Sequence, residues 1–298
     1  MINAQLHHRI GLKNILFPTD FSPAAQWAAP FVRTIAQEYD AKVTTLHVAV
    51  PNVFTYTTPD SPQAAIKLQQ EWSLAQAKKA ETELPGICNQ VVVRTAPDVW
   101  TMVNDVIQAE QIDLVIVGTR GLMGLPKVLM GSTAEEIFRR SSVPVITIGP
   151  SARSDQESGA QLRRIVFASD FTAESEAAAP YALSFAEENN AQLTLVHVIE
   201  MHLSHKEQKS TRVSVAEAMH QLHQIVPSED EPWCRPETVV EHGDPATRIL
   251  AVASEQNADL IVLGIRHTNH VTEASHIEKS IAHTIVADAS CPVLTVRN

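Results

Sequence analysis

An internal repeat is the feature that most constrains how this chain can fold. Four segments of the first half return in the second half in the same order, and the first two keep one spacing of 150 residues. The recurring pairs are ILFPTDFS at 15–22 with IVFASDFT at 165–172, LHV at 46–48 with VHV at 196–198, DLVIVG at 113–118 with DLIVLG at 259–264, and VPVI at 143–146 with CPVL at 291–294. Because each copy has the length of a typical domain, the repeat predicts a tandem duplication of two domains.

The joint between the copies sets the predicted domain boundaries. Residues 149–162 are polar, contain two glycines and a proline, and show no apolar period, which is typical of a flexible linker. We therefore expect the first domain to span residues 1–148 and the second to span residues 163–298.

Each copy alternates short apolar runs with longer segments of helical period, which indicates βαβ units. In the first copy the expected strands lie near 15–18, 43–48, 91–94, 114–117 and 145–148, and the expected helices begin near Pro23, Ser61, Val99 and Ser132. The predicted class is α/β, with two tandem repeats that are each an open five-stranded parallel sheet with helices on both faces, as in Rossmann-like nucleotide-binding folds. Such sheets bind ligands beyond the carboxyl ends of their strands, so a site is expected in the loops after Pro18, Val48 and Val117.

Composition and charge narrow the functional classes. With 44% hydrophobic and 19% charged residues the chain is not a disordered protein, and it contains no apolar run of the ~18 residues that a membrane helix needs. The formal charge of −11 predicts no general nucleic-acid binding, since phosphate backbones require clustered Lys and Arg. Residues 1–150 hold 12 basic and 13 acidic side chains and residues 151–298 hold 11 and 21, so an anionic ligand meets less repulsion in the first half.

The cysteines and the first residues predict a cytoplasmic location. Cys88, Cys234 and Cys291 are odd in number and far apart, which suits a reducing compartment. The first residues lack the pattern of a secretory signal, and we expect no membrane association. We expect Cys88 and Cys291 to lie on buried strand segments and to be unreactive.

The loop after the fourth expected strand, residues 118–133, predicts phosphate binding. Its glycines allow backbone amides to approach an anion, and Gly131-Ser132 opens a helix whose free N–H groups and dipole favour negative charge. An alternative is that Ser132 and Glu135 form an S-x-x-E capping box that stabilises this helix with no ligand. The loop matches neither GxxxxGK[ST] nor GxGxxG, so the usual P-loop and dinucleotide motifs are absent.

Taken together, these motifs resemble the universal stress protein family in its tandem two-domain form. The resemblance rests on ILFPTDFS at 15–22, LHV at 46–48, DLVIVG at 113–118 and the spacing G-x2-G-x9-G-S from Gly118 to Ser132, and it covers nearly the whole chain. The glycine spacing is similar to the ATP-binding signature of that family. The resemblance therefore implies ATP as the ligand of the first repeat, with a divalent ion, Mg²⁺, held mainly by the phosphates.

The resemblance also implies which residues form the ATP site. The phosphates and ribose would be held by Gly118, Thr119, Arg120, Gly121, Gly131, Ser132 and Thr133, and the adenine end would be lined by Pro18, Thr19, Asp20 and Val48. Without the resemblance, Asp20 also fits a turn residue after the first strand. We interpret His47 as a core histidine rather than a ligand.

The second copy departs from this signature. It keeps Gly264 but has His267 in place of the second glycine and Lys279 in place of Gly131, and its loop is two residues longer. Side chains would then fill the space where backbone cradles phosphate. The second repeat is therefore predicted to keep the fold without binding ATP.

Three functional hypotheses remain open at this point. The first is a nucleotide-binding stress or signalling protein without enzymatic activity, in which ATP changes the shape of the protein or its protein partners. The second is a slow ATPase or an ATP-dependent enzyme of a related α/β fold. The third is a ligand-free scaffold with a metal-binding second repeat, suggested by the H-x2-H pairs that begin at His202, His220 and His267.

The last strand of each copy suggests how the copies assemble. Residues 145–148 and 293–296 are apolar, follow a proline, and would lie at a sheet edge with unpaired backbone groups. Members of the resembled family dimerise through this strand. We therefore expect an intramolecular pseudo-dimer, with a homodimer of the whole chain through other surfaces as a further option.

Overall fold

The structure, a computed structural model, describes residues 10–50, 67, 70–75, 77–78, 84, 86–119, 131–149, 152, 160–200, 214–226, 236–266 and 280–297. The chain divides into two compact units, one built mainly on residues 11–150 and the other mainly on residues 161–298. This division follows the sequence repeat.

The first unit is a parallel sheet in the order β3-β2-β1-β4-β5. Its strands are β1 (Asn14–Pro18), β2 (Lys42–Ala49), β3 (Asn89–Thr95), β4 (Leu114–Gly118) and β5 (Val145–Ile148). Its helices are α1 (Pro23–Gln26), α2 (Ala29–Tyr39), α4 (Val99–Ala109) and α5 (Ser132–Arg140), with further helical residues at 70–75. The helix expected to begin near Ser61 has its predicted start outside the described residues.

The second unit repeats this arrangement in the order β10-β9-β6-β7-β8, again with parallel pairs. Its strands are β6 (Arg164–Ala168), β7 (Gln192–Ile199), β8 (Glu237–His242), β9 (Leu260–Gly264) and β10 (Val293–Val296). Its helices are α6 (Ala173–Glu188), α7 (Val215–Ile225), α8 (Pro245–Glu255) and α9 (Ile281–Asp288). The predicted α/β class is confirmed.

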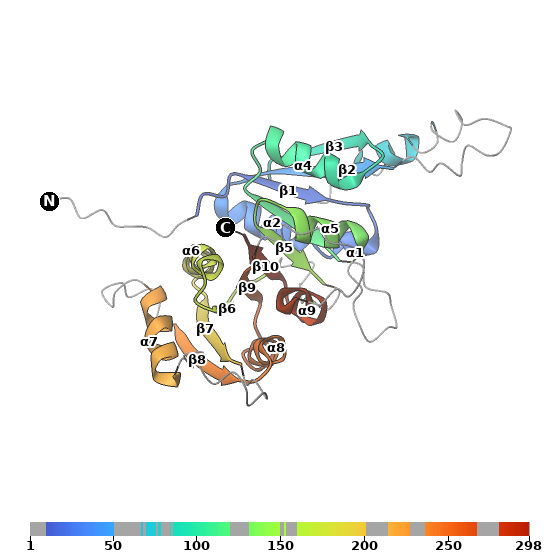
Figure 1. The fold of residues 1–298 in the computed structure, drawn as a ribbon. Coiled ribbons are helices and arrows are strands. Elements are labelled where there is room, and N and C mark those ends of the chain that lie inside the picture. The colour runs from blue at the N-terminus through green and yellow to red at the C-terminus, as the bar shows by residue number, and fades with distance from the viewer. Residues whose placement is uncertain are drawn as a thin grey trace, which may run out of the picture. The chain divides into compact units, whose positions relative to one another are not determined.

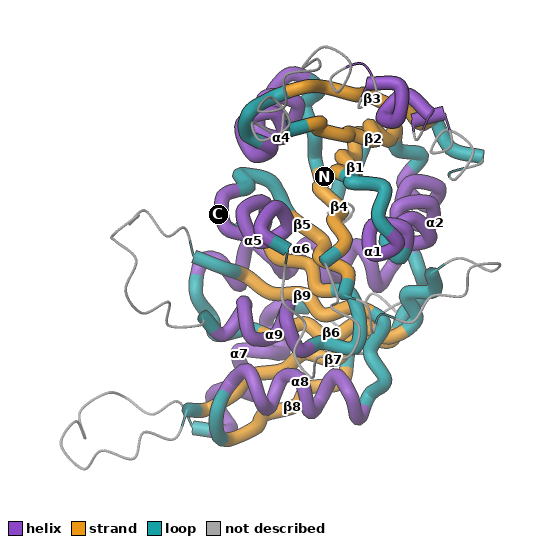
Figure 2. The backbone as a smooth tube through the Cα atoms, turned by 90° about the vertical axis from the view of Figure 1, so that its right-hand side faces the viewer, coloured by secondary structure: helices purple, strands orange, loops and turns teal. Residues whose placement is uncertain are grey.

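Helices cover both faces of each sheet. In the second unit α6 and α7 lie along one face while α8 and α9 lie along the other (Figure 1). In the first unit α1 and α2 lie opposite α4 and α5 (Figure 2). Between β1, β4, α4 and α5 the packed core includes fully buried Leu16, Val103, Val115 and Ile137. None of the helices in the described part of the chain is long and apolar enough to cross a membrane.

The aspartate before β4 and its counterpart before β9 have the same structural role. Asp113 Oδ2 accepts hydrogen bonds from the backbone N–H groups of Lys13 and Asn14, at 2.7 and 2.9 Å. Asp259 Oδ2 accepts from Arg163 and Arg164, both at 3.0 Å. These bonds fix the start of the first strand of each unit beside the fourth, which explains why this residue recurs in the repeat.

The helix after the first strand differs between the units. Ser22 caps it in the first unit by accepting from Ala25 N, as Pro23 at the helix start predicts, but the helix stops at Gln26 and a new one begins at Ala29. Pro30 lies at the start of that new helix, where its missing N–H costs nothing. In the second unit α6 runs unbroken through Pro180, so the sequence match of the prolines does not give the same helix geometry.

Candidate functional site

A pocket in the first unit lies where β1 and β4 end, beside the N-terminus of α5. Most of its walls come from the β1–α1 loop, the ends of β2 and β4, and the first residues of α5. The lining residues are Pro18, Thr19, Asp20, Ser22, Ala25, Leu46, Val48, Val99, Val117, Gly118, Gly131, Ser132, Thr133 and Ala134. This is the edge of the sheet at which parallel α/β folds bind their ligands.

Eight of the eleven residues predicted from the resemblance line this pocket. They are Pro18, Thr19, Asp20, Val48, Gly118, Gly131, Ser132 and Thr133. Thr119 is buried and turned toward β5, with its N–H and hydroxyl both donating to the Ile148 carbonyl, at 2.8 and 3.3 Å. Arg120 and Gly121 lie outside the described residues.

Six lining residues were not predicted. They are Ser22, Ala25, Leu46, Val99, Val117 and Ala134. Ser22, Leu46 and Val117 lie within the motifs that were recognised, so their position in the repeat could have identified them. Val99 belongs to α4, and only the fold brings the start of that helix to the pocket.

The β1–α1 loop is held in one conformation by its own hydrogen bonds. Thr19 N donates to the Leu46 carbonyl at 2.9 Å, Phe21 N to Thr19 Oγ1 at 3.0 Å, and Ser22 N to Asp20 Oδ1 at 2.9 Å. Phe21 has a positive φ of 57°, a conformation that favours glycine. A wall of the pocket is therefore fixed before any ligand binds.

The N-terminus of α5 faces the pocket without a side-chain cap. The N-cap is Gly131, with no side-chain hydrogen bond among the described residues, and Ser132 is already the first helical residue. The alternative of a capping box with Ser132 as N-cap is therefore wrong. Gly131, Ser132 and Thr133 bring the free N–H groups of the first turn and the positive end of the helix dipole to the pocket wall.

The corresponding helix of the second unit is capped. Ser280 is the N-cap of α9, and its Oγ accepts from His283 N at 3.2 Å. Residues 267–279, which include the substituted His267 and Lys279, lie outside the described residues. In the first turn of α9 the His283 N–H therefore already has a hydrogen-bond partner, the Ser280 hydroxyl. The first turn of α5 has no such side-chain cap among the described residues.

The two loop aspartates also differ between the units. The Asp170 carboxylate accepts from the Ser175 and Thr172 hydroxyls and from Thr172 N, whereas the first unit has Ala25 where the second has Ser175. Burial raises the pKa of Asp170, but these hydrogen bonds and the charge of Arg266 outweigh it and hold the pKa below its usual value. Asp170 is therefore bonded both to its own loop and to α6, while Asp20, which accepts from Ser22 N in its own loop, also lines a pocket.

Gly264 packs closely against α6 in the second unit. A Cβ added at Gly264 would lie 2.3 Å from the backbone carbonyl carbon of Glu174 and 2.4 Å from Ser175 N. Gly264 is the counterpart of Gly118, which lines the pocket of the first unit. In the second unit Gly264 thus allows the first turn of α6 to pack directly against the end of β9.

The predictions for the histidines and cysteines of the chain have different outcomes. His220 and His223 are exposed on α7, and the described residues contain no group of three or more His, Cys, Asp or Glu that could hold a metal ion. Cys291 is buried as expected, and burial raises its pKa to about 12. The expectation for Cys88 is wrong, because Cys88 is exposed just before β3, which is an edge strand.

Comparison with known proteins gives one consistent family. The model of the universal stress protein family matches the chain twice, over residues 11–149 and 161–297. A universal stress protein of Mycolicibacterium smegmatis is 24% identical over 295 residues, which cover 95% of this chain and 96% of that protein. One of Methanocaldococcus jannaschii is 27% identical over 143 residues, 46% of this chain and 81% of that protein.

A solved structure shows the same fold. The crystal structure of a universal stress protein from Archaeoglobus fulgidus has a TM-score of 0.69 and 21% identity, and the match covers 95% of this chain and 98% of that chain. The tandem organisation therefore extends to a protein of similar length.

Proposed function

Because this chain belongs to the universal stress protein family over both of its repeats, we propose that its first repeat binds ATP and that the protein acts in the stress response as a nucleotide-dependent switch. The observation that carries the proposal is the uncapped N-terminus of α5 in the wall of a pocket at the ends of β1 and β4. Free N–H groups and a helix dipole at one point favour an anionic ligand.

The lining residues suggest how the nucleotide is oriented. The phosphates lie at Gly131, Ser132 and Thr133, where two hydroxyls add donors to the backbone N–H groups. The adenine lies toward Pro18 and Val48, whose apolar side chains suit the faces of a purine. Arg120 and Gly121 are assigned to the phosphates by the family signature.

Magnesium ion fits as a companion of the nucleotide rather than as a separate site. The described lining contains a single carboxylate, that of Asp20, and Mg²⁺ is usually held by one or two carboxylates together with phosphates and water. When bound, Mg²⁺ would neutralise phosphate charge. The described lining has no histidine, cysteine or second carboxylate, and we assign the pocket to binding rather than to catalysis.

The second repeat is proposed not to bind ATP. Its α9 is capped by Ser280, its Asp170 is engaged by Thr172 and Ser175, and Gly264 is in contact with α6. The expected stoichiometry is one ATP per chain.

Calorimetric titration with MgATP tests this proposal. The expected result is one site, and adenine nucleotide should also be found by absorbance and mass after the purified protein is denatured. Gly131→Val should abolish binding because the added branch occupies the space in which backbone amides approach phosphate.

The matched control is Gly11→Val. Gly11 has no atom within 4 Å of an added Cβ, so this change should leave ATP affinity unaltered. Unchanged affinity in folded Gly131→Val would refute the site, and two equivalent sites would refute its restriction to the first repeat. Amide hydrogen exchange with and without MgATP tests the proposed switch. If ATP changes the conformation of the protein, backbone amides outside the residues that line the pocket should also exchange more slowly.

A further inference from the structure

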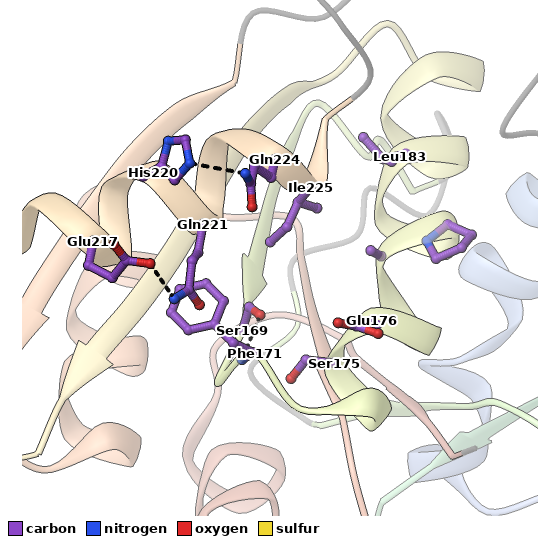
Figure 3. A pocket seen from close by; sticks show the side chains of 12 residues that line it. Ser169, Phe171, Ser175, Glu176, Leu183, Glu217, His220, Gln221, Gln224 and Ile225 are labelled. Carbon is purple, nitrogen blue, oxygen red and sulfur yellow. Dashed lines mark hydrogen bonds between the residues drawn. The ribbon is translucent and has the colours of Figure 1, made fainter. Parts of the chain in front are cut away.

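The second unit contains a separate cavity between α6 and α7. Its volume is about 640 Å³, within the range of small-molecule sites. Twelve of the described residues line it, namely Ser169, Phe171, Ser175, Glu176, Ala179, Pro180, Leu183, Glu217, His220, Gln221, Gln224 and Ile225 (Figure 3). None of them has a role in the ATP site proposed above.

The matching place in the first unit has much less open space among the described residues. The equivalent position there is bounded by Thr19, Phe21 and Ala25, which correspond to Ser169, Phe171 and Ser175, and its cavity has only about 10 Å³. The Trp72 ring lies 6.3 Å from the Phe21 ring and 5.9 Å from the His47 ring, centre to centre.

The helix that borders this cavity, α7, carries no aromatic side chain within its described bounds. Phe171 stacks on His197 at 4.3 Å, but α7 has the sequence VAEAMHQLHQI, without Phe, Tyr or Trp. Among the described residues, the open space beside the loop after the first strand is therefore larger in the second unit than in the first.

The polar part of the lining is rich in hydrogen-bond acceptors. Glu176 lies on α6 and Glu217 on α7, on opposite sides of the cavity (Figure 3). Glu217 Oε1 accepts from Gln221 Nε2 at 2.9 Å, which orients the carboxylate, and no hydrogen bond to its other oxygen is found among the described residues. Pro180 has no N–H, so the Glu176 carbonyl lacks the donor that a helix normally supplies.

The described lining has one basic side chain, His220, whose Nε2 lies 3.0 Å from Gln224 Nε2. The described lining residues include no Lys or Arg, and residues 151–298 together carry ten more acidic than basic side chains. A cation is therefore attracted to this unit by its overall field as well as by Glu176 and Glu217.

The remaining lining is apolar. The ring of Phe171 and the side chains of Pro180, Leu183 and Ile225 offer a surface for a flat hydrophobic group. Since the described residues lack a metal-binding cluster, the acceptors suit an organic cation better than a metal ion. We propose that this cavity is a binding site for an organic ammonium ion that carries a flat apolar body.

Three probes of similar shape and different charge test the proposal on the full chain. They are tryptamine, a cation, tryptophol, its neutral alcohol, and indole-3-propionate, an anion. Calorimetry should show one site for tryptamine, weaker binding of tryptophol and no binding of the anion. The result should be the same with saturating MgATP, which separates this site from the proposed ATP site.

Variants locate the site. Glu176→Gln and Glu217→Gln should each weaken tryptamine binding by about tenfold, the effect of losing one charge-assisted hydrogen bond, and should leave tryptophol binding unchanged. Gln221→Trp should fill the cavity and abolish binding of both probes. The control is Glu255→Gln, an exposed carboxylate of α8 outside the lining, which should have no effect.

Thermal unfolding of each variant checks that it is folded, and the glutamate changes keep the shape of exposed side chains. Magnetisation transfer between the indole protons and the Phe171 ring gives a second readout in the unmodified protein. Equal affinity for tryptamine and tryptophol, or tryptamine affinity that neither glutamine variant changes, would overturn the proposal.

Discussion

His47 Nδ1 lies 2.9 Å from the carbonyl oxygen of Thr19, and His197 Nδ1 lies 2.8 Å from the carbonyl oxygen of Ser169. Because a carbonyl can only accept, each Nδ1 carries the proton. Each ring also lies against the phenylalanine two residues further along the loop, at 4.8 Å for Phe21 and 4.3 Å for Phe171. The histidine of the second strand thus fixes the loop after the first strand in both units, which agrees with the interpretation of His47 as a core histidine.

Replacing His47 by Phe should lower both stability and ATP affinity. The change leaves the Thr19 carbonyl without its buried donor, which costs about 1–3 kcal/mol of unfolding free energy. It also frees the loop that carries Thr19 and Asp20, so the proposed ATP site loses its fixed wall. Denaturant unfolding and MgATP titration measure the two effects.

His197→Phe is the matched control for this change. It removes the same hydrogen bond in the second unit and should destabilise the protein by a similar amount without weakening ATP binding. A loss of ATP affinity in His197→Phe equal to that in His47→Phe would contradict the assignment of the nucleotide to the first repeat.

Gly264→Ala should destabilise the second unit. The new Cβ would lie 2.3 Å from Glu174 backbone atoms, so α6 must shift, at a cost of about 1–3 kcal/mol. Gly11→Ala adds the same methyl group in open space and should leave the unfolding midpoint within error. Equal midpoints for the two variants would show that the contact between Gly264 and α6 is not tight in solution.

The sequence was sufficient to predict the features that depend on pattern. Repeats, apolar runs and glycine spacing predicted the strands and eight residues of the pocket, because motifs at the ends of neighbouring parallel strands meet at one edge. The break between Gln26 and Ala29 was not predictable, since Pro180 at the matching position of Pro30 is accommodated inside a helix.

The cavity between α6 and α7 could not be predicted for a similar reason. It depends on how the side chains of α6 and α7 fill the space beside Phe171, which the apolar pattern of the sequence does not specify. The sequence also does not show whether Gly131 or Ser132 is the N-cap of α5, since both residue types are common there. This difference of one residue decides whether the helix begins with a capping hydroxyl or with uncapped backbone N–H groups.

Cys88 and Cys291 should react very differently with iodoacetamide. Cys88 is exposed, whereas burial and the charge of Asp259 raise the pKa of the Cys291 thiol to about 12 and leave almost no thiolate at pH 8. Peptide mass analysis after brief labelling should find Cys88 modified and Cys291 unmodified. In denaturant both should label at similar rates, and early modification of Cys291 in the folded protein would contradict its buried position.

Asp170 should make the stability of the second unit depend on pH under acidic conditions. Its folded-state pKa is lowered, so the ionised carboxylate stabilises the folded state at neutral pH. This contribution is complete above the unfolded-state pKa of about 3.9 and is lost as the pH falls through the lower folded-state value. Asp170→Asn keeps an acceptor for Ser175 and Thr172 but has no charge, and it should therefore be less stable than the unmodified protein at pH 7, with the difference shrinking below pH 4.

Denaturant midpoints measured from pH 7 to pH 2.5 test this prediction. Asp105→Asn, an exposed aspartate on α4 for which the described residues show no hydrogen bond, is the control. If the midpoint difference between Asp170→Asn and the unmodified protein stays constant down to pH 2.5, the hydrogen bonds from Ser175 and Thr172 do not favour the ionised carboxylate in solution.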